Sequence, residues 1–87
     1  MPELHIERID EAVAVRADFR GGVVSPVAFR RQRRQHRISR VNARWIERSG
    51  RHRTFFFSVT DDTGDVYQLQ LQSADMLWWL DTVTLEG

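Results

Sequence analysis

The stretch Thr54–Leu71, with the sequence TFFFSVTDDTGDVYQLQL, decides the fold class. Apolar residues occupy every second position on both sides of the turn segment Asp61–Gly64. This period of two predicts two half-buried β-strands, and the turn between them is favoured because glycine tolerates a positive φ. The stretch therefore predicts a β-hairpin with one face in the core. The predicted inward residues are Phe55, Phe57, Val59, Tyr67, Leu69 and Leu71.

The same alternation predicts two further strands nearer the N-terminus. Val13–Phe19 alternates cleanly and is followed by Gly21-Gly22, which predicts a turn. Val24–Arg31 continues after this turn. Pro26 cannot donate a backbone hydrogen bond, so it indicates an edge strand, a bulge or the start of the strand.

The segment Arg37–Ile46 fits two structures. Ile38, Val41 and Trp45 have helical spacing, but they also fit a long strand with a bulge near Ser39-Arg40 that switches the inward parity. We favour the bulged strand, because the neighbouring segments are strands and isoleucine, valine and tryptophan are good strand residues.

The whole chain, residues 1–87, is predicted to be a single β domain. Met76–Leu85 is the last apolar segment, and the alternative is that Ser73–Asp75 opens a short helix through Leu80. Five or six short antiparallel strands with turns every eight to twelve residues predict an all-β fold, either a small barrel or a strongly curved sheet. The segment 1–11 is left open as a loosely ordered N-terminal region.

The charge of the chain is strongly polarised. All thirteen basic residues are arginine, and ten of them lie in Arg30–Arg53 with Glu47 as the only acid, which gives this stretch a net charge of +9. Residues 54–87 carry six acids and no base. Arginine has a planar, forked set of donors that suits phosphates, carboxylates and stacking. This separation of charge therefore indicates one of two arrangements. Either acids within the chain pair with the arginines, or the arginines create a positive electrostatic potential that attracts a polyanion.

Gln32-Arg33 lies where the sequence predicts the turn of a basic hairpin. This pair lacks the Asn-Gly chemistry of a tight two-residue turn, so we expect a wider or a strained turn. The four arginines around it, Arg30, Arg31, Arg33 and Arg34, would repel one another. Such crowding favours a partner outside the chain.

Several classes of protein are not indicated by the sequence. The chain has no cysteine, so a disulfide framework and a thiolate site are excluded. It has no apolar run near the ~20 residues of a membrane span and no signal-peptide pattern, so we expect a cytoplasmic protein without a membrane partner. His5, His36 and His52 lack the spacing of zinc ligands, and no cofactor is predicted.

One short motif resembles a catalytic one. Asp62-Thr63-Gly64 matches the tripeptide of aspartic proteases, in which two carboxylates of a dimer share a proton. Asp65 follows instead of a small residue, and Asp61 precedes the motif, so four acids would meet in such a dimer. An exposed hairpin turn explains the same residues, and we predict that the protein is not an enzyme.

A series of motifs runs along residues 12–84. Its positions are Val13, Val15, Gly21, Gly22, Pro26, Phe29, the basic hairpin Arg30–Arg37, Ile38, Val41, Trp45, Phe55–Val59, Asp62–Gly64, Tyr67, Leu69, Trp79, Leu80 and Val83. The order of these motifs resembles a small uncharacterised β domain that occurs alone or appended to the C-terminus of ImuB-like proteins, which are relatives of Y-family translesion DNA polymerases. The chain departs from the family pattern at Arg31, Gln32 and His36. The resemblance implies an association with proteins that work on damaged or single-stranded DNA, and it supplies no catalytic activity.

The leading prediction is therefore an accessory module that binds nucleic acid, namely single-stranded or distorted DNA, in DNA damage tolerance. Its arginines would follow a phosphate backbone, and exposed aromatic residues would stack on bases. The predicted backbone-binding residues are Arg30, Arg31, Arg33, Arg34, Arg37, Arg40, Arg44, Arg51 and Arg53, and the predicted stacking or interface residues are Trp45, Phe56 and Trp78.

Two alternatives remain open at this point. The basic stretch can be neutralised within the chain by Glu47, Asp61, Asp62, Asp65 and Asp75. It can also bind an acidic protein surface, with the protein acting as an adaptor or a homodimer whose exposed aromatic residues form the interface. Alternation places one of Trp78 and Trp79 on the outer face, and the sequence does not decide which.

Overall fold

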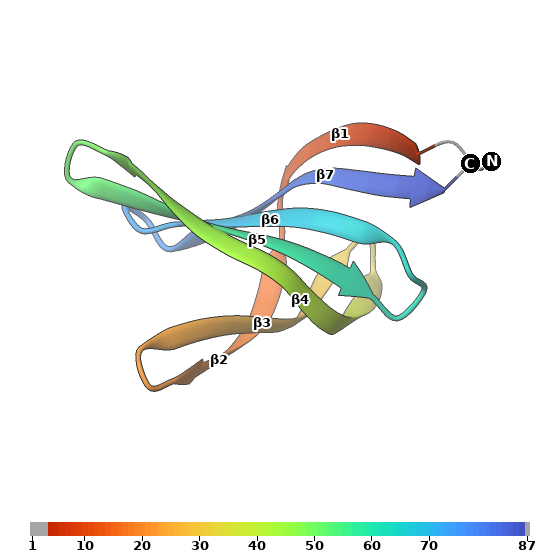
Figure 1. The fold of residues 1–87 in the computed structure, drawn as a ribbon, viewed down its shortest axis with the longest axis horizontal. Coiled ribbons are helices and arrows are strands. Elements are labelled where there is room, and N and C mark those ends of the chain that lie inside the picture. Colours follow the sequence, from red (N-terminus) through yellow and green to blue (C-terminus); the bar gives the residue numbers. More distant parts are fainter. Residues whose placement is uncertain (1–3, 87) are drawn as a thin grey trace.

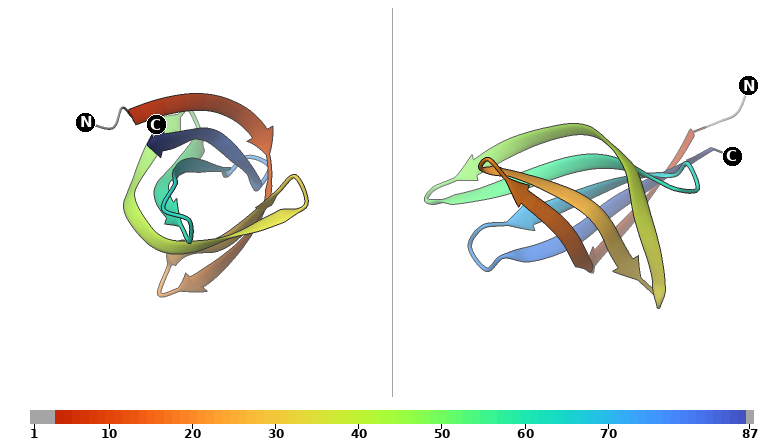
Figure 2. Two further views of the ribbon diagram at one scale, coloured as in Figure 1. Left: turned by 90° about the vertical axis from the view of Figure 1, so that its right-hand side faces the viewer. Right: turned by 90° about the horizontal axis from the view of Figure 1, so that it is seen from below.

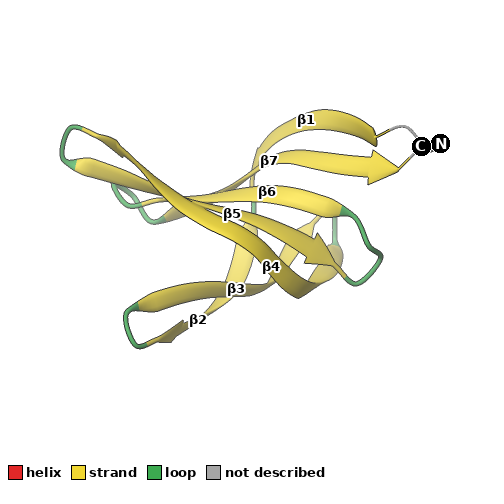
Figure 3. Cartoon of the chain, viewed as in Figure 1, coloured by secondary structure: helices red, strands yellow, loops and turns green. Residues whose placement is uncertain are grey.

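The structure is a computed structural model, and it describes residues 4–86. These residues form strands and turns (Figure 3). The seven strands form one antiparallel sheet in the order β1-β7-β6-β5-β4-β3-β2 (Figure 1). The predicted all-β class is therefore confirmed. The strands are β1 Leu4–Ala12, β2 Ala14–Arg20, β3 Val23–Arg31, β4 Arg34–Ser49, β5 His52–Asp61, β6 Val66–Gln72 and β7 Leu77–Glu86.

The sheet is strongly curved and wraps around its own core (Figure 2). It is not closed into a barrel, because its edge strands β1 and β2 are paired with β7 and β3 and not with each other. Only Val13 separates the two edge strands, and its N–H donates to the carbonyl of Trp78 at 3.1 Å. One stretch of chain thus runs from one edge of the sheet to the other. Of the two predicted forms, the strongly curved sheet is therefore confirmed and the closed barrel is wrong.

The N-terminal segment is more ordered than the sequence indicated. Residues 4–12 form β1, which pairs with β7 from Leu4↔Glu86 to Ala12↔Trp79, whereas residues 1–3 lie outside the described part of the chain. Leu4 is 71% exposed and Ile6 is 66% exposed. Backbone pairing with β7 therefore holds this strand more than burial does, which explains why apolar alternation did not reveal it. Its presence raises the strand count from the predicted five or six to seven.

The core lies on the concave face of the sheet. In antiparallel strands, directly paired residues project to the same face. The central row Phe57–Leu69–Leu80 crosses β5, β6 and β7, and Leu69 and Leu80 are completely buried. The inward alternation predicted for the β5–β6 hairpin is confirmed. The buried core cluster is Phe29, Phe57, Val59, Tyr67, Leu69, Leu80 and Val83.

Strand β4 is the bulged strand that the sequence favoured over a helix. Its pairing with β5 shifts between Ile38 and Arg40, as predicted, and again between Val41 and Ala43. Each bulge inserts a residue without a direct partner and re-aims the side chains that follow it. Ile38 and Val41 pack against the core on either side of the first bulge, whereas Trp45, beyond the second bulge, lies on the outer face. The helix-like spacing of these three residues therefore does not mark one buried face.

The turns explain the other ambiguous segments. Gln32 and Arg33 form a tight two-residue turn between Arg31 and Arg34, with φ values of 52° and 64°. This left-handed conformation is strained for residues that carry a Cβ, so the prediction of a strained turn is confirmed. Ser73–Met76 form the β6–β7 turn, and the alternative of a short helix through Leu80 is wrong.

Candidate nucleic-acid interface

The β3–β4 hairpin brings together five of the predicted arginines. Its cross-strand pairs include Ala28↔Arg37, Arg30↔Gln35 and Arg31↔Arg34. The hairpin projects from the side of the curled sheet (Figure 2). We call Arg30, Arg31, Arg33, Arg34 and Arg37 the arginine hairpin.

The other predicted arginines do not join this cluster. Strand β4 is 16 residues long, and it carries them away from the arginine hairpin. Arg40 pairs with Thr60 on the outer face, whereas Arg44 pairs with the buried Phe57 and so faces the concave side. Arg51 and Arg53 lie at the β4–β5 turn, at the opposite end of β4 (Figure 1). The predicted site is therefore divided into four places.

Internal pairing neutralises little of the basic stretch. Arg31 donates from Nε to Oε2 of Glu11 at 3.0 Å, and this acid was not among the predicted partners. Among the residues that the structure describes, no other arginine of Arg30–Arg53 has a carboxylate oxygen within 4.0 Å. Asp61, one of the predicted partners, binds a histidine instead. The positive charge of the hairpin thus remains largely uncompensated.

A buried His36–Asp61 pair anchors the arginine hairpin to the β5–β6 turn. The distance from His36 Nδ1 to Asp61 Oδ2 is 3.0 Å. Asp61 Oδ1 also accepts hydrogen bonds from the N–H and hydroxyl of Thr63 and from the N–H of Asp65. Burial alone would raise the pKa of Asp61, but these hydrogen bonds outweigh it and lower the pKa below 3.8. Asp61 is therefore ionised, and His36 Nδ1–H is the donor.

Aromatic stacking supports the same anchor. The His36 ring is parallel to Phe29, with ring centroids 4.7 Å apart, and it meets Tyr67 edge-on at 5.5 Å. Burial raises the pKa of Tyr67, and the nearby Asp61 and Asp65 carboxylates raise it further. The base of the arginine hairpin is thus fixed to the core. Arg30 and Arg37 project to the outer face, whereas Arg31 and Arg34 share the face of Phe29 and His36.

The predicted aromatic residues lie on two faces of the sheet. Trp45 and Phe56 are a directly paired, stacked couple on the outer face, with ring centroids 5.3 Å apart. Trp78 is half-buried and packs against Phe57 on the core side, which answers the question that the sequence left open between Trp78 and Trp79. Trp79 takes the outer position in β7, but it is also half-buried, and its Nε1–H has no hydrogen-bond partner.

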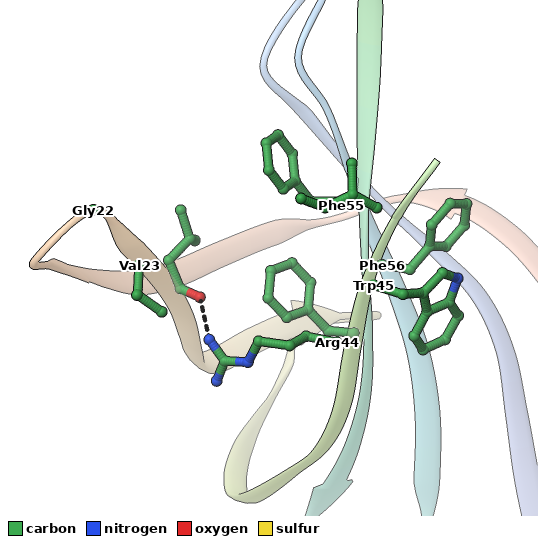
Figure 4. Close-up of a pocket in the computed structure, with 9 residues that line it drawn as sticks. Gly22, Val23, Arg44, Trp45, Phe55 and Phe56 are labelled. Atoms are coloured by element: carbon green, nitrogen blue, oxygen red, sulfur yellow. Dashed lines mark hydrogen bonds between the residues drawn. The ribbon is translucent and has the colours of Figure 1, made fainter. Parts of the chain in front are cut away.

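An apolar groove of about 390 Å³ opens between the β2–β3 turn and strands β4 and β5 (Figure 4). Val23 and Val24 form one wall, and Phe55 and Ile46 belong to the other. Arg44 spans the groove, because its Nη1–H donates to the carbonyl of Val24 at 3.2 Å and its guanidinium lies 5.9 Å from the Phe57 ring centroid. No local sequence pattern indicates this groove, because its two walls come from distant segments.

Other sites considered in the sequence have no supporting geometry. Asp62 and Thr63 are exposed in the β5–β6 turn, where the neighbouring Asp61 carboxylate is occupied by structural hydrogen bonds. Within residues 4–86, no three histidine or acidic side chains are arranged to hold a metal ion. The described residues also contain no helix long and apolar enough to cross a membrane.

Comparisons with protein-family models, with curated proteins and with solved structures gave no match to this chain.

Proposed function

We propose that this protein is a non-enzymatic accessory module that binds single-stranded or distorted DNA through its arginine hairpin. The observation that carries the proposal is the hairpin's uncompensated charge: within the described chain, four of its five arginines have no carboxylate oxygen within 4.0 Å. Unpaired like charges on adjacent strands destabilise a sheet. A polyanionic partner would offset this repulsion.

The geometry suits sequence-independent binding to phosphates. Arg30, Arg33, Arg34 and Arg37 are exposed, and guanidinium groups form charge-assisted, bidentate hydrogen bonds with phosphate oxygens. The tight turn and the buried His36–Asp61 pair hold these arginines on a rigid support. A support of this kind reduces the entropy lost on binding.

The groove beside Arg44 is a second element of the proposal. Phe55 is half-buried and Ile46 is 52% exposed, so apolar surface remains open there. Base stacking on aromatic residues and arginine contributes about 1–3 kcal/mol per base in single-strand binding proteins. A base of an unpaired strand would fit against Phe55 and the Arg44 guanidinium. Duplex DNA keeps its bases stacked internally, so the groove favours an unpaired strand.

The test is fluorescence anisotropy of a labelled single-stranded oligonucleotide with two charge-matched variants. One variant replaces Arg30, Arg33 and Arg34 by glutamine, and leaves Arg31 in its ion pair with Glu11. The control replaces Arg48, Arg51 and Arg53, at the opposite end of β4, by glutamine. We expect a much larger loss of affinity in the hairpin variant than in the control variant. Equal losses of affinity in the two variants would contradict a binding site on the arginine hairpin.

A homodimer or protein adaptor is the second candidate function. Three apolar side chains near the groove are unusually open: Phe19 is 72% exposed, Ile46 52% and Val23 48%. Adjacent exposed apolar residues mark interaction surfaces. Sedimentation equilibrium of the wild type and of Phe19→Ser tests this candidate. Association that is lost in the variant supports it, whereas a monomer at all concentrations excludes the homodimer.

A further inference from the structure

The outer face of β2, β3 and β4 carries a set of arginines that is wider than the arginine hairpin. Arg16 in β2 pairs with Ala28 in β3, and Ala28 pairs with Arg37 in β4. All three side chains therefore project to the same face. Arg30 projects there as well, because it lies two residues from Ala28 in the same strand.

The centre of this set is hollow. Alanine occupies position 14 in β2 and position 28 in β3, so no long side chain rises from the middle of the set. Neighbouring side chains nevertheless leave Ala28 only 5% exposed. A shallow recess of about 330 Å³ results, and Arg16, Arg30 and Gln35 are among the residues that line it. We call this feature the alanine recess. Arg37 flanks it on β4.

Charge in the alanine recess is uncompensated. Among the described residues, Arg16, Arg30 and Arg37 have no carboxylate oxygen within 4.0 Å. Neighbouring strands are about 4.8 Å apart, so the Arg16 and Arg37 backbones are separated by about 10 Å, with the small Ala28 between them. Two flexible arginine side chains at this separation can both bind one tetrahedral oxyanion that lies above Ala28.

We infer that the alanine recess is a binding site for one phosphodiester group, and that Arg16, which lies outside the basic stretch of the sequence, is one of its ligands. Arg16 and Arg37 would bind the non-bridging oxygens from opposite sides, with Arg30 as a third donor. The Gln35 amide can donate to a neighbouring sugar or phosphate oxygen. The inference rests on the proposed function, and it extends the phosphate path from the hairpin onto β2.

The experiment compares Arg16→Gln with Arg20→Gln in binding to a labelled single-stranded oligonucleotide. Arg20 is a matched control, because it lies in β2 with the same outward parity but outside the alanine recess. We expect Arg16→Gln to weaken binding about five- to tenfold and to reduce the slope of log K against log salt by about 0.7, the contribution of one phosphate on a single strand. Arg20→Gln should leave both values close to those of the wild type.

The variant Arg16→Lys distinguishes binding by the forked guanidinium group from binding by positive charge alone. It should keep the salt slope and still lose affinity, because lysine cannot bind a phosphate in the bidentate geometry of arginine. Urea unfolding of each variant, followed by tryptophan fluorescence, controls for folding. If Arg16→Gln and Arg20→Gln bind equally well, and the wild type binds through the arginine hairpin, the alanine recess is not a phosphate site. The proposed function would then remain intact.

If the wild type binds no oligonucleotide, the proposed function fails, and the alanine recess is then tested with pyrophosphate. Amide NMR shifts concentrated at Ala14, Ala28 and their neighbours, and lost in Arg16→Gln, would support a phosphate site. An absence of shifts there would overturn it.

Discussion

Replacing Asp61 by alanine tests the anchor of the arginine hairpin. The substitution removes one acceptor for His36 Nδ1–H, at 3.0 Å, and three acceptor contacts in the β5–β6 turn. Water can replace the contacts with Thr63, which is exposed, but His36 is only 8% exposed. A buried donor without a partner costs about 1–3 kcal/mol, and each lost turn contact about 0.5–1.5 kcal/mol. With water replacing the two Thr63 contacts, the His36 donor and the Asp65 N–H remain, and we therefore expect Asp61→Ala to lose about 2–4 kcal/mol of unfolding free energy.

Urea unfolding at neutral pH, followed by tryptophan fluorescence, measures this loss. Asp62→Ala is the control, because Asp62 is exposed in the same turn, and it should change stability by less than about 0.5 kcal/mol. A loss below about 1 kcal/mol in Asp61→Ala, or an equal loss in Asp62→Ala, would refute the account of the anchor.

Acidification provides an independent test of the same residue. The pKa of Asp61 is lowered in the folded protein, so its ionised form stabilises the fold above the unfolded pKa of about 3.9. This contribution disappears as the pH falls through the lowered folded pKa. The difference in unfolding free energy between the wild type and Asp61→Asn should therefore shrink from pH 7 towards pH 2. A difference that is constant over this range would contradict the lowered pKa of Asp61.

Three further predictions concern the core, the turn and the groove. Leu69→Ala, at a completely buried position, should destabilise the fold by about 3–4 kcal/mol in urea unfolding; a loss near 1 kcal/mol would place Leu69 outside the tightly packed core. The double variant Gln32→Asn/Arg33→Gly should raise the unfolding free energy by about 1–2 kcal/mol, because both positions have positive φ, and an unchanged urea midpoint would argue against strain. Phe55→Ala should weaken single-strand binding by about 1–3 kcal/mol in anisotropy, and an unchanged affinity would contradict base stacking in the groove.

The strands with clean alternation could be predicted from the sequence, and those held by pairing could not. Phe57, Val59, Tyr67 and Leu69 are buried where a period of two placed them. Strand β1 escaped detection because most of its residues are exposed and its order depends on pairing with β7. This is a contact between distant parts of the chain, and local hydrophobicity does not encode it.

The candidate site shows the same division. The arginine hairpin could be predicted because its charge and its turn are local in the sequence. The separation of Arg40, Arg44 and Arg51 could not, because it depends on the bulges and on the length of β4. The inward position of Trp78 depends on its register with Leu71, and Arg16 joins Arg37 only through the pairing of three strands.

A salt titration of single-stranded DNA binding tests the central claim most directly. The wild-type protein is titrated into a labelled oligonucleotide of about twelve nucleotides at salt concentrations from about 20 to 200 mM, and anisotropy reports the binding constant. If about four to six phosphates are contacted, log K should fall with log salt at a slope between about −3 and −4. An absence of binding at the lowest salt, or an affinity that does not depend on salt, would contradict the account.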